Sequence, residues 1–167
     1  MQSILRTILV AAFVLLVPVL AFSQNGDTLN IGGSVPLVLT LTVTPDPDAD
    51  NLTLVGSTAG NVEQVATVSV STNNTAGWEL YAWSSNVESG AAATSALVNA
   101  DGDPIGYQVT YTGGEATAAI GSGGMLLKEV LTNTPEVDVP LSIVYDQSLA
   151  FPAGYYSDQL TIVLRAK

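Results

Sequence analysis

The feature that most constrains the fold of this chain is an alternation of apolar and polar residues that recurs along almost its whole length. From residue 28 the odd positions run Leu29, Ile31, Gly33, Val35, Leu37, Leu39, Leu41 and Val43. Because successive side chains of a β-strand point to opposite faces, a period of two predicts strands with one buried face. Pro36 has no N–H to donate, which predicts either a division of this run into two strands or an edge position.

The same period returns in segments rich in Val, Thr, Ile and Tyr, separated by turn sequences such as "NNTAG", "TGGE" and "FPAG". Besides the run at 28–43, strands are expected at 51–56, 62–72, 77–84, 105–112, 115–120, 127–132, 137–146 and 155–166. Residues 89–98 fit either a helical turn or a loop. Short strands at this spacing predict an all-β fold, an immunoglobulin-like antiparallel β-sandwich of about 7–10 strands.

The last strand, 155–166, has one of the clearest alternations in the chain, with Tyr156, Leu160, Ile162 and Leu164 on one side. Because so many strands precede it, we expect it to lie at or near the centre of a sheet. An edge that pairs with another chain is expected instead at the other end, in residues 29–35.

The first 23 residues have the features of a secretory signal peptide. Arg6 provides the positive charge, residues 8–19 form the apolar stretch, and the small residues Ala21 and Ser23 precede a cleavage site before Gln24. The apolar stretch is short for a membrane span. We therefore expect residues 1–23 to be removed, and residues 24–167 to form a single β-sandwich domain. That domain is secreted, to the cell surface, the extracellular space or the periplasm, without membrane insertion.

Composition excludes several kinds of chemistry. The chain has no Cys and no His, which removes thiol nucleophiles, the commonest general base and the Ser/His/Asp triad. Once Arg6 is removed, three basic residues face fifteen acidic ones, a net charge of −12. This charge repels nucleic acid and anionic membrane surfaces, so neither is an expected partner. No enzymatic activity is expected.

One acidic turn suggests a metal site. Asp46, Asp48 and Asp50 alternate as the first ligands of a calcium loop do, and carboxylate oxygens suit calcium. The turn is not an EF-hand, because the sixth and twelfth positions hold Asn51 and Ser57 in place of Gly and Glu. A calcium site of another kind and a solvated turn both remain open. No other cofactor is expected.

The strand at 77–84 suggests a binding surface. Its alternation places Trp78 and Leu80 on one face, and Tyr81 and Trp83 beside Glu79 on the other. If Tyr81 and Trp83 are exposed, they form an aromatic platform suited to stacking on sugars or anchoring a protein. The alternative is that a second layer or a loop covers them.

Two stretches resemble a known group of secreted proteins. In "VSVSTNNTAGWELYAWSS" an alternating strand leads into an Asn, a loop and a Gly-aromatic-x-Leu sequence; the positions are Val68, Val70, Asn73, Gly77, Trp78 and Leu80. In "PAGYYSDQLTIVLRA" the matching positions are Ala153, Gly154, Tyr156, Asp158, Leu160, Ile162 and Leu164. Both stretches are similar to strands of bacterial fimbrial or pilin-like domains and of spore-coat-protein-U-like domains.

The resemblance implies an immunoglobulin-like sandwich that builds surface fibres or coats, by pairing with further copies of itself or with another surface subunit. In chaperone–usher pilins the sandwich lacks one strand, which the N-terminal extension of a neighbour supplies. The matching donor here is residues 28–35, whose strand-pairing residues are Leu29, Ile31, Gly33 and Val35. Two alternatives stay open: a carbohydrate- or protein-binding module that uses Tyr81 and Trp83, and a solitary surface domain with an unknown partner.

Overall fold

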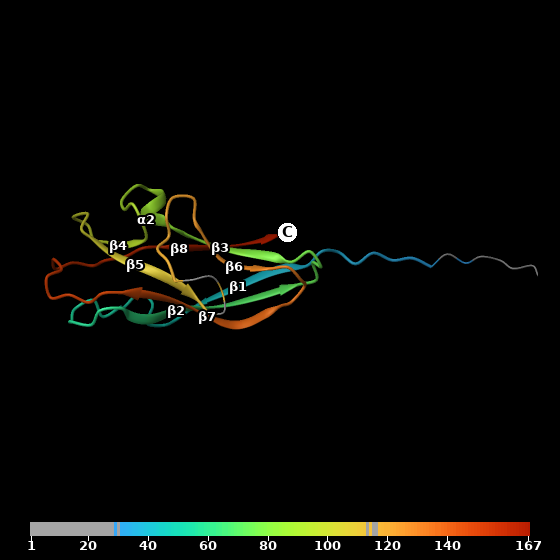
Figure 1. Ribbon diagram of the computed structural model, residues 1–167, viewed down its shortest axis with the longest axis horizontal. Coiled ribbons are helices and arrows are strands. Elements are labelled where there is room, and N and C mark those ends of the chain that lie inside the picture. The colour runs from blue at the N-terminus through green and yellow to red at the C-terminus, as the bar shows by residue number, and fades with distance from the viewer. Residues whose placement is uncertain (1–28, 30, 113, 115–116) are drawn as a thin grey trace, which may run out of the picture. The chain divides into compact units, whose positions relative to one another are not determined.

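The computed structural model describes residues 29, 31–112, 114 and 117–167 (Figure 1). Residues 36–167 form one compact unit, separate from the segment that precedes it. The expected signal peptide, 1–23, lies outside the described residues. The elements are β1 (Leu39–Pro45), β2 (Asn61–Thr72), β3 (Trp78–Ser84), α2 (Ser85–Glu88), β4 (Ala96–Val98), β5 (Pro104–Tyr111), β6 (Met125–Val130), β7 (Glu136–Tyr145) and β8 (Leu160–Ala166).

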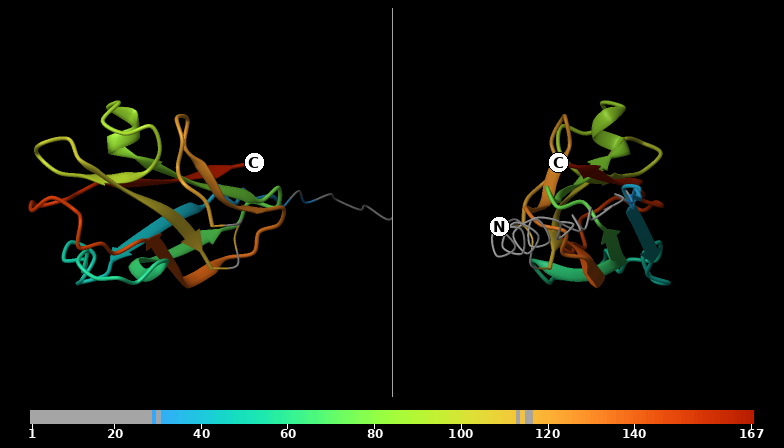
Figure 2. Two further views of the ribbon diagram at one scale, coloured as in Figure 1. Left: turned by 60° about the vertical axis from the view of Figure 1, so that its left-hand side comes forward. Right: turned by 90° about the vertical axis from the view of Figure 1, so that its right-hand side faces the viewer.

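The strands form two antiparallel sheets, which confirms the all-β expectation. One sheet has the order β1-β2-β7-β5-β4 and the other the order β6-β3-β8. The two sheets lie as separate layers, with α2 beyond the three-stranded sheet (Figures 1 and 2). In the described part of the chain no helix is long and apolar enough to cross a membrane.

The core lies between the two sheets, and the alternation of the sequence explains its composition. Along β3 every second side chain is buried, so that Trp78, Leu80 and Ala82 face inward. The facing sheet contributes Val68, Tyr107 and other inward residues of β2, β5 and β7 to the same cluster. A fully buried Val or Leu contributes roughly 1.5–3 kcal/mol. Without disulfides, this burial and the strand pairing hold the domain together.

Several expected elements differ from the structure. Residues 51–56 form no strand, although Leu52 and Leu54 pack against the core. At 115–120 the described residues contain only an isolated bridge between Ala118 and Val109. The helical turn comes before 89–98, at α2, because the Ser84 hydroxyl caps it by accepting the Val87 N–H. Alternation alone shows neither which segment finds a partner strand nor where a cap begins a helix.

The prediction that the last strand is central was wrong. Among the described residues β8 pairs with β3 alone, so it forms an edge of the three-stranded sheet. Its inward side chains Leu160, Ile162 and Leu164 are only partly buried. The alternation predicted the inward face of this strand, but the number of its neighbours depends on the chain topology.

Gly77 is the glycine on which the start of β3 depends. Its φ is +95°, and a Cβ at this position would lie 1.9 Å from the carbonyl oxygen of Val130. Only glycine combines that φ with so close an approach of the neighbouring strand β6.

We therefore expect Gly77→Ala to lower the free energy of unfolding by about 3 kcal/mol, from backbone strain and overpacking. Urea denaturation followed by tryptophan fluorescence measures this loss. The matched control is Gly121→Ala, because a Cβ at Gly121 meets no atom within 4 Å. Equal stability of the two variants would contradict the prediction.

Candidate functional site at the open seam

An open seam runs between the edges of the two sheets. β1 is an edge of the five-stranded sheet and β8 an edge of the three-stranded sheet. The two strands approach each other, but no backbone pairing joins them in the described part of the chain. Each strand therefore keeps one side of its backbone N–H and C=O groups free to pair with a further strand.

Beside this seam lies an apolar groove of about 320 Å³ that reaches into the core. Its walls come from both edges: Val43 and Pro45 of β1, and Leu160 and Ile162 of β8. Its floor includes buried residues of the five-stranded sheet, namely Ala66, Tyr107, Leu141 and Ile143. The groove thus offers a further strand both free edges and an apolar surface.

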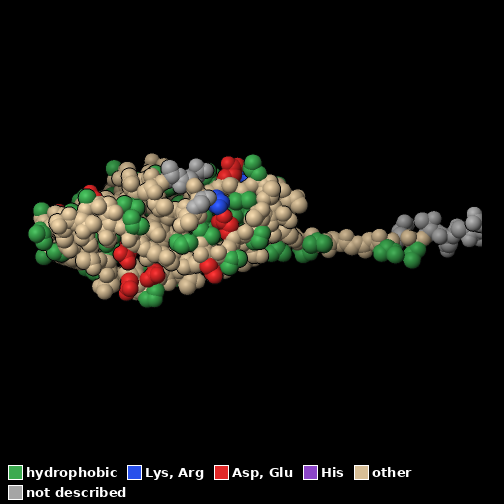
Figure 3. Space-filling view, turned by 60° about the horizontal axis from the view of Figure 1, so that its bottom comes forward, with side chains coloured by type: hydrophobic (Ala, Val, Ile, Leu, Met, Phe, Trp, Pro, Cys, Tyr) green, Lys and Arg blue, Asp and Glu red, His purple; other side chains and the backbone are tan. Residues whose placement is uncertain are grey.

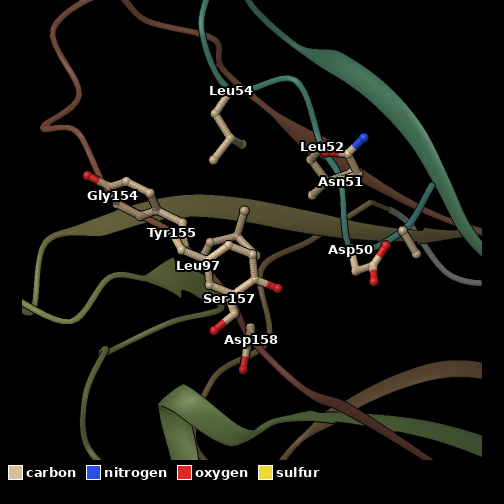
Figure 4. A pocket seen from close by; sticks show the side chains of 11 residues that line it. Asp50, Asn51, Leu52, Leu54, Leu97, Gly154, Tyr155, Ser157 and Asp158 are labelled. Atoms are coloured by element: carbon tan, nitrogen blue, oxygen red, sulfur yellow. The ribbon is translucent and has the colours of Figure 1, made fainter.

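A second, more polar cavity of about 220 Å³ adjoins the groove (Figure 4). The two cavities share lining residues, including Leu52, Leu97 and Asp158. Asp50, Asn51, Tyr155 and Ser157 add polar groups to its rim. Sequence reasoning missed both cavities, because period two identifies inward side chains but not where facing sheets leave a gap.

Asp158 fastens the start of β8 to the elements around the groove. One carboxylate oxygen accepts the hydroxyls of Ser84, at 2.5 Å, and Tyr107, at 2.6 Å. The other accepts the backbone N–H groups of Asn86, at 3.1 Å, and Gln159, at 2.8 Å. Burial and then the bond to Asp158 raise the pKa of Tyr107 well above its usual value, so the phenol stays a donor.

The strand-pairing residues predicted before Pro36 are not part of a sheet. Leu29, Ile31 and Val35 expose 82, 89 and 85 % of their surface, and no strand is present in residues 29 and 31–38. Hydrophobic side chains are visible along this segment in Figure 3. The large apolar side chains of this segment are therefore exposed and have no partner strand among the described residues.

Within the domain, Asn73 acts as a substitute strand partner for the residues just before β1. The Asn73 side chain accepts the Val38 N–H at 2.7 Å and donates to the Pro36 carbonyl at 2.8 Å. The Asn73 N–H donates to the Val38 carbonyl at 3.2 Å. These bonds hold the chain at Pro36–Val38, just before β1 begins.

Tyr81 and Trp83 do not form an open platform. Both are half-buried, and the Arg165 guanidinium lies over their rings, 4.7 Å and 5.2 Å from the two centroids. A Cβ at Gly124 would lie 2.5 Å from Trp83 Cε2, so the chain at Gly124 packs against the indole. The Tyr81 hydroxyl donates to Glu79. Arg165 thus covers one face of each ring.

Asp46, Asp48 and Asp50 lie in the turn after β1. The Asp48 N–H donates to the Asp46 carboxylate, which closes the turn on itself. In the part of the chain that the structure describes, no group of three or more Asp, Glu, His or Cys side chains is placed to hold a metal ion. The calcium prediction gains no support from this arrangement.

No family model matches the chain, and no curated protein matches it. In the part of the chain that the structure describes, the seam combines an apolar groove with two strand edges.

Tyr107, at the floor of the groove, makes the folding stability of the protein depend on pH. The folded protein holds the Tyr107 proton to a higher pH than the unfolded chain, whose tyrosine titrates near 10.0. The unfolded state then binds fewer protons above pH 10, so stability falls there as pH rises. The raised pKa of Tyr111, which is due to burial and Glu136, acts in the same direction.

We expect the free energy of unfolding to fall above pH 10 by about 1.4 kcal/mol per pH unit for each of these tyrosines. Tyr107→Phe should be less stable at neutral pH but show a shallower slope above pH 10. Urea titrations at closely spaced pH values measure both quantities. Identical slopes for the variant and the natural sequence would rule out this role of Tyr107.

Proposed function

We propose that this protein is an exported, non-catalytic structural subunit that assembles by strand addition. Residues 28–35 of one copy enter the seam between β1 and β8 of the next copy. The single observation that carries this proposal is the apolar groove between two free strand edges in a chain that also has an exposed, alternating apolar segment.

The order of the strands supports an immunoglobulin-like sandwich with one strand missing. In that fold one sheet has the order A-B-E-D and the other contains C, F and G. Here β1-β2-β7-β5 correspond to A-B-E-D, and the neighbours β3 and β8 correspond to C and F. The position of G, on the far side of β8, has no counterpart in the described residues. This position lies at the seam.

The dimensions of the segment suit that position. A strand rises about 3.3 Å per residue, so residues 28–35 span about 26 Å and the seven residues of β1 about 23 Å. Leu29, Ile31, Gly33 and Val35 share one face and can point together into the groove. Burying each large side chain contributes about 2 kcal/mol, which offsets part of the entropy lost on association.

The negative charge of the copies opposes this assembly at low salt. Copies with a net charge of −12 repel one another, and the basic side chains Lys128 and Lys167 are already paired with glutamates within the domain. Salt screens such repulsion within about 10 Å at 0.1 M. Strand addition driven by apolar burial should therefore become stronger as salt is added.

Removal of residues 24–35 from the mature protein tests the donor. We expect the natural mature chain to form polymers in 0.15 M salt and the truncated chain to remain a folded monomer, because it retains the domain but lacks the donor. Sedimentation velocity and negative-stain imaging measure assembly, and urea denaturation checks folding. If the truncated chain unfolds, the segment is an internal strand and the donor role is wrong.

A complementation experiment tests donor and acceptor together. Ile31→Asp places a charge on the inward face of the donor, whereas Val43→Asp places one in the wall of the groove. Each variant alone should be monomeric, since a charge cannot be buried there unpaired. Mixed in equal amounts they should form a heterodimer and no polymer, because one intact donor meets one intact groove.

Matched controls carry the same charge elsewhere. Ser34 lies on the opposite face of the donor, and Val55, which is 65 % exposed, does not line the groove. Ser34→Asp and Val55→Asp should both polymerise as the natural sequence does. Loss of assembly in these controls, or no heterodimer in the mixture, would contradict the proposal.

A further inference from the structure

The loop between β1 and β2 covers one end of the seam. Leu52 and Leu54 are partly buried against the core, whereas Asn51, Thr53 and Val55 between and beside them are exposed. Leu52 lines both the apolar groove and the polar cavity. In Figure 4 the two leucines project from this loop into the cavity that Leu97 also lines. The segment has the alternation of a strand but belongs to neither sheet.

The attachments of this loop are uneven along its length. The Thr53 carbonyl accepts the hydroxyl of Tyr145, at 3.2 Å, and the side-chain amide of Gln147, at 2.9 Å. The Leu54 carbonyl accepts the Ser148 N–H at 3.1 Å. Before Thr53, by contrast, the backbone bonds of Ala49 and Asn51 close only the local turn, to Asp46 and Asp48.

The segment up to Leu52 is therefore held by the burial of its side chains rather than by a strand ladder. Segments with few buried contacts and local hydrogen bonds open at a lower free-energy cost than paired strands. A single apolar side chain that covers free edges also protects an unassembled subunit from unspecific pairing.

We propose that Leu52 is a displaceable plug of the seam. In the unassembled subunit its side chain occupies part of the groove, and it moves out when the donor segment of a second copy enters. This inference rests on the proposed function, and it adds a step that regulates assembly: donor binding has to compete with the chain's own loop.

The test uses the full mature chain carrying Ile31→Asp, which cannot donate, and a synthetic peptide of residues 27–36 as the probe. Leu52→Ala in this background should bind the peptide about tenfold more tightly, because truncation weakens the competitor; tenfold corresponds to about 1.4 kcal/mol. Val55→Ala, in the same loop but exposed, should leave the affinity unchanged. Isothermal titration calorimetry measures the peptide affinity of the parent and of the two variants.

The sign of the change decides between a plug and a wall. If Leu52 belonged to the groove wall that contacts the peptide, Leu52→Ala would bind more weakly. If the Ile31→Asp parent binds the peptide and the Leu52→Ala variant binds it more weakly or equally well, the plug role of Leu52 is wrong but the proposed function stands. If the parent chain bound no peptide at all, the proposed function would fail together with the plug.

Hydrogen exchange provides a second readout that does not depend on a variant. Saturating peptide should increase amide exchange at residues 49–52, which leave the groove, and decrease it along β1 and β8, which gain a partner. Protection of residues 49–52 on peptide addition would overturn the plug.

Discussion

The structure depends on the burial of one shared apolar layer between two sheets, whose edge strands β1 and β8 are not paired with each other in the described part of the chain. In a chain without cysteines, the inward residues of both sheets are what hold the domain together, and Trp78, Tyr107 and Leu141 are central among them. At the seam, β1 and β8 are edge strands, each with a neighbour on one side only among the described residues. The groove lies beside these two edges, and both the proposed assembly and the proposed role of Leu52 depend on them.

Polar interactions around the seam stabilise the edge strand β8. Asp158 accepts four hydrogen bonds and joins the start of β8 to β3, α2 and β5. Bonds to a charged acceptor are stronger than bonds between neutral groups, so this carboxylate fixes the wall of the groove without a further strand. The fixed wall is compatible with a binding surface that exists before its partner arrives.

The sequence predicted the inward and outward faces of most strands but not all of their neighbours. Trp78 and Leu80 are buried and Tyr81 and Trp83 lie on the outer face, as the alternation required. Of the two expectations for Tyr81 and Trp83, cover matches the structure better than exposure. Arg165 lies over both rings and Gly124 packs against Trp83, and both residues are distant from the rings in the sequence. The expected strand at 51–56 has the right side-chain pattern but no partner strand, because pairing requires an edge within reach of its backbone.

The sequence alone establishes the period of two, the strong acidity, the absence of cysteine and histidine chemistry, and an apolar alternating segment before Pro36. These are local properties, which short-range sterics and residue chemistry dictate. Tertiary packing, in contrast, sets the edge position of β8, the groove between β8 and β1, and the place of Leu52 in the lining of that groove. Those features depend on which strands become neighbours, and that choice is made by long-range packing that no single segment encodes.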